Sequence, residues 1–233
     1  MSGWLTPAEA EALWLSLKVS AVATLVSLPL GVGVAWVIVR SRLPGRGLIN
    51  AIVHVPLIIP PVVVGYLLLV AFGRRGWLGA WLDSTFGIEV AFTWVGAAIA
   101  AAIIAFPLLV RAVRLSLETV DRRLEQAART LGASRADVFR SITLPMILPG
   151  IVTGAILAFA RCIGEFGATI TFVGSIPGET QTLPLLLYQF ANQPGQEDAA
   201  ARIIVISLVV AFAALFASEI LARRVARRIG QSP

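Results

Sequence analysis

The sequence predicts an all-α membrane protein, a polytopic bundle of about five transmembrane helices. Three observations predict this fold class. Hydrophobic residues make up 58% of the 233-residue chain, only 14% of the residues are charged, and the mean hydropathy is +0.86. Uncharged apolar runs of about 20 residues, long enough to cross a bilayer as a helix, recur along the chain. Lipid cannot satisfy exposed backbone groups, so we expect residues 1–233 to form a single transmembrane domain.

The first span is predicted at about residues 13–39. It carries no charge after Lys18, and Gly31 and Gly33 within it favour close packing against another helix. The loop at residues 40–50 follows, with three arginines and no acidic residue. Because basic residues concentrate in cytoplasmic loops, this loop is predicted to be cytoplasmic and the N-terminus to lie outside.

The second span, about residues 51–72, contains Pro56, Pro60 and Pro61. Each proline removes a helix hydrogen bond, so we expect this helix to be bent or locally unwound. Such a break is tolerated where protein or a water-filled cavity faces the freed backbone groups. The break therefore indicates either a helix that lines a translocation pathway or a kink that serves packing. His54 is expected to be a packed histidine rather than a ligand.

The third span is predicted at about residues 90–110, and it returns the chain to the cytoplasm. The loop before it, residues 73–89, is glycine-rich and contains Trp77 and Trp81, which suit a membrane–water interface. The segment after it, residues 111–145, is therefore predicted to be a cytoplasmic loop.

The fourth span, about residues 146–165, ends with Arg161 and Glu165 after an apolar run. Ionisable residues at such depth usually face a bundle interior or an aqueous path. A local ion pair between positions i and i+4 is the competing interpretation. Residues 166–194 mix glycines, prolines and a short apolar piece, and we expect them to form a re-entrant or interfacial segment.

The last span is predicted at about residues 199–221, with a basic cytoplasmic C-terminus after it. This topology places 14 of the 19 basic residues in cytoplasmic segments. The net charge of +6 is therefore explained by membrane topology, and no nucleic-acid partner is expected. Cys162 is the only cysteine, so neither an internal disulfide nor a cysteine metal site is predicted.

The cytoplasmic segment carries the signals of two helices joined by a sharp turn. Residues 124–131 read as a short helix followed by Gly132, a residue typical of the position after a helix end. Ser134 is then predicted to cap a second helix, with Asp137 completing a capping box. Pro145 is expected to end that helix before the lipid begins. Small residues at the bend would let a soluble partner approach the backbone closely.

The spacing in this segment resembles the EAA loop of ABC importer permeases, which docks on the cytoplasmic ATPase subunit. Gln126 stands at the glutamate position of that motif, and we expect its neighbour Glu125 to cover the same role. The resemblance assigns the docking role to Glu125, Gln126, Ala127, Ala128, Gly132, Ala133, Ser134, Ile142, Leu144 and Pro145.

Longer stretches, at residues 54–70, 73–79, 123–134 and 160–184, look like the molybdate permease subunits of this family. The resemblance implies the type I ABC importer permease fold, in a multi-pass protein of the bacterial inner membrane. It also implies a homodimer, an ATPase dimer that binds ATP-Mg, and a periplasmic binding protein that delivers molybdate and also tungstate. Sulfate permeases share the docking motif and an element like residues 165–168, so a sulfate or other oxyanion importer is the alternative.

No catalytic role is expected for this chain. It has no GxxxxGK[ST] loop, so ATP hydrolysis is assigned to a partner and no cofactor or metal is predicted on the chain itself. An intramembrane enzyme would need a constellation such as HExxH, GxSxG or paired aspartates. A scaffold or channel that works without an ATPase is a further alternative. For the translocation pathway, the candidates are Pro60, Pro61, Arg161 and Glu165, because a dianion in a low-dielectric region needs a cation and free backbone N–H groups.

Overall fold

The computed structural model describes residues 5–41 and 43–228, apart from the side chains of Leu215, Ser218, Glu219 and residues 221–228. Arg42 and the side chains of the predicted basic C-terminus therefore lie outside the described part. All regular structure in the described residues is helical. The elements are α1 (Pro7–Arg40), α2 (Arg46–Ile58), α3 (Pro61–Phe72), α4 (Trp77–Phe86), α5 (Trp94–Glu118), α6 (Arg122–Thr130), α7 (Arg135–Val138), η1 (Phe139–Thr143), α8 (Leu144–Ile163), α9 (Gly167–Phe172), α10 (Leu183–Ala191) and α11 (Glu197–Arg228).

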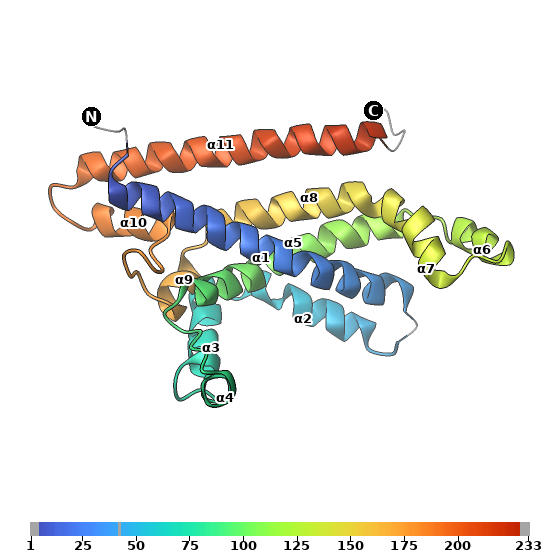
Figure 1. Ribbon diagram of the computed structural model, residues 1–233, viewed down its shortest axis with the longest axis horizontal. Coiled ribbons are helices and arrows are strands. Elements are labelled where there is room, and N and C mark those ends of the chain that lie inside the picture. The colour runs from blue at the N-terminus through green and yellow to red at the C-terminus, as the bar shows by residue number, and fades with distance from the viewer. Residues whose placement is uncertain (1–4, 42, 229–233) are drawn as a thin grey trace.

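The long helices α1, α5, α8 and α11 run along one axis, and α6 and α7 lie at one end of it (Figure 1). Three described helical stretches are long and apolar enough to cross a membrane: α1, α5 and the continuous stretch Arg135–Ile163. The pair α2 and α3 would make a fourth span if it counts as one bent helix. The predicted last span falls within α11, and the number of five spans stays a prediction.

Helix α5 forms the centre of the bundle, between α1 and α8. Its buried surface includes four alanines that are almost fully buried, at positions 97, 100, 101 and 105. Such small side chains let neighbouring helices approach closely. Gly31 of α1 packs closely on Leu109 of α5, because a Cβ atom at Gly31 would lie 2.8 Å from Leu109 Cδ2. Gly33 meets open space instead, so the predicted close contact holds at Gly31 alone.

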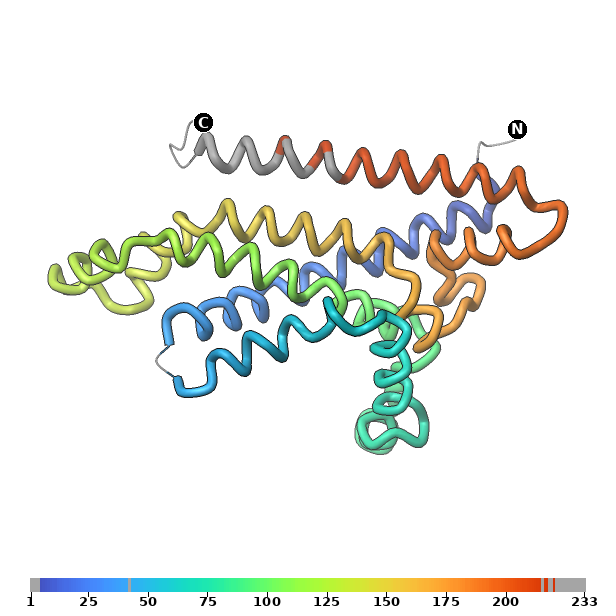
Figure 2. The backbone as a smooth tube through the Cα atoms, turned by 180° about the vertical axis from the view of Figure 1, so that it is seen from behind, coloured from blue at the N-terminus to red at the C-terminus, as the bar shows by residue number. Residues whose placement is uncertain are grey.

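The predicted break in the second span is confirmed. The helix stops between Ile58 and Pro61, and α3 leaves the axis of α2 at 111°. Figures 1 and 2 show α3 turning away from the long helices, with α4 at its far end. Gly65 of α3 packs on Ala168 of α9, because a Cβ atom at Gly65 would lie 2.5 Å from the Ala168 carbonyl oxygen. The break therefore creates a lateral contact between two short helices.

The third span differs from its predicted bounds. Thr93 caps α5 by accepting a hydrogen bond from the Gly96 amide, so the helix begins four residues later than predicted. It continues eight residues past Val110, to Glu118. Arg114 and Glu118 form an i, i+4 ion pair of 2.8 Å that supports these added turns. The first part of the predicted loop at residues 111–145 is therefore helical.

Pro145 does not end the second helix of this segment, so that prediction is wrong. Arg135–Ile163 is one continuous helical stretch, in which Pro145 lies in the first turn of α8. The π-helix η1 comes directly before it, and the Leu144 amide bonds to the Phe139 carbonyl five residues back. Proline lacks an amide hydrogen and crowds the carbonyl four residues earlier. The wider π turn absorbs that conflict, and the helix continues into the bundle.

Residues 166–194 contain only the short helices α9 and α10, in agreement with the predicted non-spanning segment. Helix α10 has nine residues, about 13 Å of length, which is far below the thickness of a bilayer. It packs on α11 and on the start of α1. Its N-terminal Leu183 donates its backbone N–H to the Ser16 hydroxyl of α1 at 2.8 Å.

Candidate functional site

The predicted docking segment, residues 125–145 of the loop 111–145, belongs to a helix–turn–helix at one end of the molecule (Figure 1). Asp121 caps α6 by accepting a 2.8 Å hydrogen bond from the Arg123 amide. Gly132 follows the helix with φ of +91°, a left-handed conformation that glycine adopts without a steric penalty. Ser134 and Asp137 form a complete capping box at the start of α7. The predicted turn and caps are therefore confirmed.

The docking residues differ in exposure. Near the turn, Ser134 is exposed, whereas Ala128 and Ala133 are half-buried. Gln126, Ala127 and Gly132 are exposed at the tip, and the neighbouring Leu131 is 88% exposed. The more C-terminal members lie in η1 and the first turn of α8, where they are half-buried: Ile142, Leu144 and Pro145. The tip can contact a partner directly, whereas the half-buried group connects the tip to the bundle.

Glu125 faces the chain's own bundle. Its Oε1 lies 3.1 Å from Arg40 Nη2 at the end of α1 and accepts a 2.8 Å hydrogen bond from the Thr143 hydroxyl of η1. The side chains of Arg40 and Glu125 are only 9% and 16% exposed. One carboxylate thus ties the docking helix to two other elements, and Gln126 is the exposed member of the pair. Nothing in the local sequence indicates Arg40, because 85 positions separate it from Glu125.

A groove of about 580 Å³ lies beside α6. Trp36 and Phe139 form part of its wall, with their rings edge to face at a centroid distance of 5.3 Å. Aromatic and arginine side chains are the residues that most often anchor protein interfaces. The groove therefore offers a partner both apolar surface and charge. Its lining consists of Trp36, Arg40, Arg122, Glu125, Gln126, Arg129, Arg135, Val138 and Phe139.

The second predicted group of residues lies at the other end of α8. Arg161 and Glu165 form an ion pair with 2.8 Å between Nη2 and Oε2, as the competing interpretation predicted. The Glu165 side chain is 2% exposed, and that of Arg161 is 31% exposed. The second oxygen of Glu165 accepts a 2.8 Å hydrogen bond from the Ala168 amide in the first turn of α9. Glu165 therefore holds α9 in place while it neutralises the arginine.

The break between α2 and α3 lies against the same helix. A Cβ atom at Gly167, the first residue of α9, would lie 3.0 Å from Pro61 Cβ. The predicted pathway residues are therefore linked through α9, because Pro61 lies against Gly167 and Glu165 bonds to the Ala168 amide. Pro60, Pro61, Arg161 and Glu165 are called the pathway cluster below. The sequence alone does not predict that the proline pair and the Arg161–Glu165 pair lie near the same helix, because about 100 positions separate them.

A second cation of the bundle is Lys18 of α1, after which the first span carries no charge. Its Nζ lies 3.5 Å from the centroid of the Trp94 ring, a cation–π geometry. The Trp94 amide in turn donates a 3.3 Å hydrogen bond to Glu179 Oε1. Lys18 is therefore held between α1 and α5 rather than free in the bundle.

Comparisons with known proteins place these features in a family. A family model described as "binding-protein-dependent transport system inner membrane component" matches residues 27–230. The chain is 56% identical to the molybdenum transport system permease protein ModB of Escherichia coli K12, over 97% of this chain and 99% of that protein. The ModB protein of Haemophilus influenzae is 51% identical over 96% and 97% of the two chains. A sulfate transport system permease protein, CysW of Synechocystis, is 38% identical over 90% of this chain and 76% of that protein.

Solved structures share the fold at low sequence identity. A chain of the MetNI methionine ABC transporter, in inward-facing conformations, matches with a TM-score of 0.70 and 20% identity, over 93% of this chain and 95% of that one. A bacterial ABC transporter involved in alginate import matches with a TM-score of 0.76 and 19% identity, over 94% and 80%. These likenesses show the helical permease fold.

Proposed function

Since the chain belongs to the family of binding-protein-dependent transport system inner membrane components, we propose that it is the permease subunit of an ATP-driven importer of molybdate, with tungstate as a second substrate. The similarity to molybdenum transport permeases along almost the whole chain carries this proposal. The protein is an integral membrane protein and a transport subunit, not an enzyme. Its substrate is an oxyanion that crosses the membrane unchanged.

The proposed assembly contains two copies of this chain, an ATPase dimer and a periplasmic binding protein, in the bacterial inner membrane. The docking segment lies in the cytoplasm in this arrangement, and ATP-Mg is bound by the ATPase. The exposed tip at Gln126 and Ala127, beside a groove with aromatic and arginine side chains, supports docking on a partner. The proposed topology places the N-terminus outside and the C-terminus in the cytoplasm.

The mechanism we propose is alternating access, in which ATP-driven closure of the ATPases moves the docking segments. Helical residues Arg135–Ile163 support it, because they run unbroken from the docking segment to the pathway cluster. At about 1.5 Å per residue, the 29 residues cover about 43 Å. A displacement of α7 therefore reaches Arg161 through one helix, without an intervening hinge loop.

Arg161 is proposed to attract the oxyanion during passage, and Glu165 to weaken that attraction. A dianion in a low-dielectric region gains from a nearby cation. A site that bound it too strongly would trap it, because transport also requires release. The 2.8 Å ion pair meets both needs, since Glu165 competes with the substrate for the guanidinium.

Uptake competition tests the substrate assignment. The transporter is reconstituted in vesicles with its ATPase and binding protein, and ATP-dependent uptake of radioactive molybdate is measured. We expect unlabelled tungstate to compete and sulfate in large excess to leave uptake nearly unchanged. Sulfate that competes as well as molybdate would instead favour the alternative, a sulfate or general oxyanion importer, which the lower-identity sulfate relative represents.

A further inference from the structure

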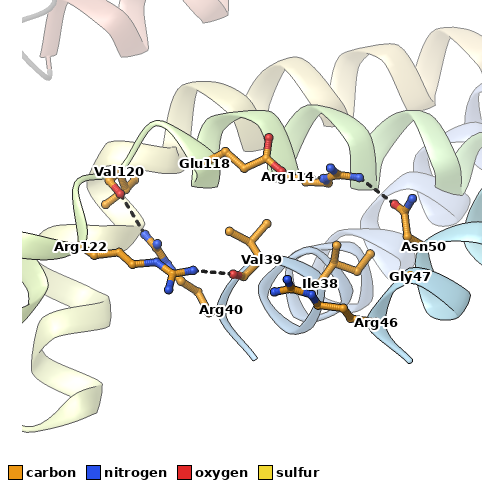
Figure 3. Close-up of a pocket in the computed structure, with 10 residues that line it drawn as sticks. All are labelled: Ile38, Val39, Arg40, Arg46, Gly47, Asn50, Arg114, Glu118, Val120 and Arg122. Carbon is orange, nitrogen blue, oxygen red and sulfur yellow. Dashed lines mark hydrogen bonds and ion pairs between the residues drawn. The ribbon is translucent and has the colours of Figure 1, made fainter. Parts of the chain in front are cut away.

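The end of α1 and the start of α6 are joined by two hydrogen bonds, which Figure 3 shows. Arg40, the last residue of α1, donates from Nη2 to the Val120 carbonyl at 3.2 Å. Arg122, the first residue of α6, donates from Nη2 to the Val39 carbonyl at 2.8 Å. The last carbonyls of a helix have no partner within it, and arginine side chains near a helix end can satisfy them. The two bonds therefore attach α1 to the helix–turn–helix that contains the docking segment.

Two further contacts strengthen this attachment. Arg40 also pairs with Glu125 of α6, with 3.1 Å between Nη2 and Oε1, and both side chains are largely excluded from water. Salt screens such a pair less than it screens an exposed one. Trp36 of α1 packs edge to face on Phe139 of η1. The end of α1 thus contacts both α6 and η1, so a displacement of the docking segment displaces α1 with it.

The other end of α1 is attached to α10 and α11. The Leu183 amide of α10 donates to the Ser16 hydroxyl at 2.8 Å, and both residues are at most 2% exposed. Arg202 of α11 pairs with Glu9 of α1 at 3.1 Å. At about 1.5 Å per residue, the 34 residues of α1 cover about 51 Å. Helix α1 continues through Pro29 and packs along α5, so it connects the docking end of the bundle to the opposite end.

Helix α10 in turn contacts the turn that follows Glu165. The ring of Tyr188 in α10 lies 5.0 Å from that of Phe166, measured between centroids. Phe166 is the next residue after Glu165, the carboxylate that pairs with Arg161. A series of contacts therefore leads from the docking segment through α1 and α10 to the pathway cluster. It is separate from the helical stretch Arg135–Ile163, which leads from the docking segment to Arg161.

The buried Glu165 gives a reason for two connections. Its carboxylate bonds to Arg161 of α8 and to the Ala168 amide of α9, and its side chain is 2% exposed. Movement of α8 alone would separate these partners and leave a buried charge unpaired, at a cost in free energy. Movement of α10, which packs on Phe166, in the same step keeps the partners of Glu165 together.

We propose that α1 is a second coupling helix, which moves α10 whenever the ATPases move the docking segment. Arg122 and Ser16 are its positioning residues, since the first attaches α1 to α6 and the second attaches α1 to α10. The inference rests on the proposed transport function, in which the docking segment moves both α1 and α8. The two helices then rearrange the pathway cluster in one step.

A cysteine reporter on α10 tests the far end of α1, in the transporter reconstituted in vesicles with its ATPase and binding protein. Ala191→Cys in a Cys162→Ala background places a thiol at the exposed last residue of α10. We expect a membrane-impermeant thiol reagent to label it at rates that differ severalfold between the nucleotide-free and the ATP-trapped transporter. Ser16→Ala should reduce that difference to less than about twofold and lower molybdate uptake about fivefold, the effect of one lost hydrogen bond, with ATP hydrolysis unchanged.

Ser20→Ala is the matched control for Ser16→Ala. Ser20 is also buried on α1, but its hydroxyl has no hydrogen-bond partner among the described residues. The control should therefore leave the reporter and uptake unchanged.

Arg122 tests the docking end of α1. Arg122→Ala removes the bond to the Val39 carbonyl and should cause the same loss as Ser16→Ala. Arg122→Lys keeps a cationic donor and should restore most of the response. Arg123→Ala removes the same charge from the next residue, whose side chain donates no hydrogen bond to any described residue, and should have no effect. Both arginines are exposed, so neither substitution leaves a buried charge unpaired.

Three results would overturn the proposal. A labelling rate that does not depend on nucleotide in the reporter without further substitutions would show that α10 does not move. Equal responses in Ser16→Ala and Ser20→Ala would make the Ser16 bond a structural contact only. Equal losses in Arg122→Ala and Arg123→Ala would assign the effect to the charge of α6. A transporter that takes up no molybdate, but whose reporter responds to ATP and loses that response in Ser16→Ala, would contradict the proposed substrate and support the role of α1.

Discussion

Glu125 and Gln126 are adjacent in the docking segment, yet their side chains face different surroundings. Glu125 binds Arg40 and Thr143 inside the molecule, whereas Gln126 is exposed beside the groove. At the residue scale, two neighbouring positions of the docking motif therefore have different roles. One side chain fixes the docking helix to the bundle, and the other is free to contact a partner.

Alanine substitution of Glu125 and of Gln126 distinguishes the structural role from the docking role. Glu125→Ala leaves the Arg40 guanidinium, which is 9% exposed, without its carboxylate, so we expect a loss of about 2–3 kcal/mol in unfolding free energy. Gln126→Ala should change stability by less than about 0.5 kcal/mol but weaken ATPase binding. Thermal unfolding is followed by the reaction of Cys162, a buried thiol and the only cysteine, with a thiol-reactive dye. Equal melting temperatures of the two variants would contradict the internal role of Glu125.

Arg161 and Glu165 allow a similar separation of fold from transport. Arg161→Gln leaves the Glu165 carboxylate, which is 2% exposed, without its cation, so it should lower both stability and molybdate uptake. The double variant Arg161→Gln with Glu165→Gln removes both charges and should regain most of the stability. If the arginine attracts the oxyanion, uptake by the double variant stays low, at least tenfold below the wild type. Uptake that recovers together with stability would reduce the pair to a structural ion pair.

At the element scale, the features that could be predicted from the sequence are the caps, turns and breaks that residues a few positions apart determine. The Ser134–Asp137 capping box and the turn at Gly132 are local, and both appear in the structure. The break at Pro60 and Pro61 was predicted for the same reason. Pro145 was misread because the π turn before it, which lets the helix continue, has no comparable local signature. The ion pair of Arg40 with Glu125 and the contact of Pro61 with α9 depend on tertiary packing, so no local pattern indicated them.

The turn at Gly132 is predicted to couple ATP hydrolysis to molybdate uptake. Gly132→Pro fixes φ near −65° where the structure has +91°, and removes the amide that bonds to the Arg129 carbonyl at 3.1 Å. The turn between α6 and α7 should then deform, and ATP hydrolysis should continue while molybdate uptake falls at least tenfold. Gly132→Ala, which costs about 1 kcal/mol at positive φ, should give a milder form of the same defect. Both rates are measured in one vesicle preparation.

Gly33→Ala is the matched control for that experiment, because a Cβ atom at Gly33 meets no other atom within 4 Å and the position is helical. It should leave uptake and its coupling to hydrolysis unchanged. Loss of hydrolysis and uptake in equal proportion in Gly132→Pro would show that the turn is needed for assembly and not for coupling.

Ala128→Trp places a bulky side chain on α6, within the predicted docking residues. This variant should also hydrolyse ATP without molybdate uptake.

At the scale of the whole molecule, one helical stretch connects the two sites. Arg135–Ile163 starts in the docking segment, passes along α5 and ends beside Arg161 and Glu165. Its glycines keep it close to α5, since a Cβ atom at Gly154 would lie 2.9 Å from Leu109 Cδ1. Close packing along this length favours movement of the stretch as a unit over bending within it. The π-helix η1 next to the docking segment is the place where such a stretch can most easily change its pitch.

A reporter at the far end of α8 tests this connection. Gly164 ends α8, is exposed and has no atom within 4 Å of an added Cβ, so Gly164→Cys in a Cys162→Ala background should fold. We expect the rate at which a membrane-impermeant thiol reagent labels this cysteine to differ severalfold between the nucleotide-free and the ATP-trapped transporter. The cause would be movement of α7 transmitted through η1 and α8 to the pathway cluster. Adding Gly132→Pro should make the labelling rate independent of nucleotide while ATP hydrolysis continues. A rate that still responds to ATP in that variant would mean that the signal reaches the pathway by another route, through α5 or α1.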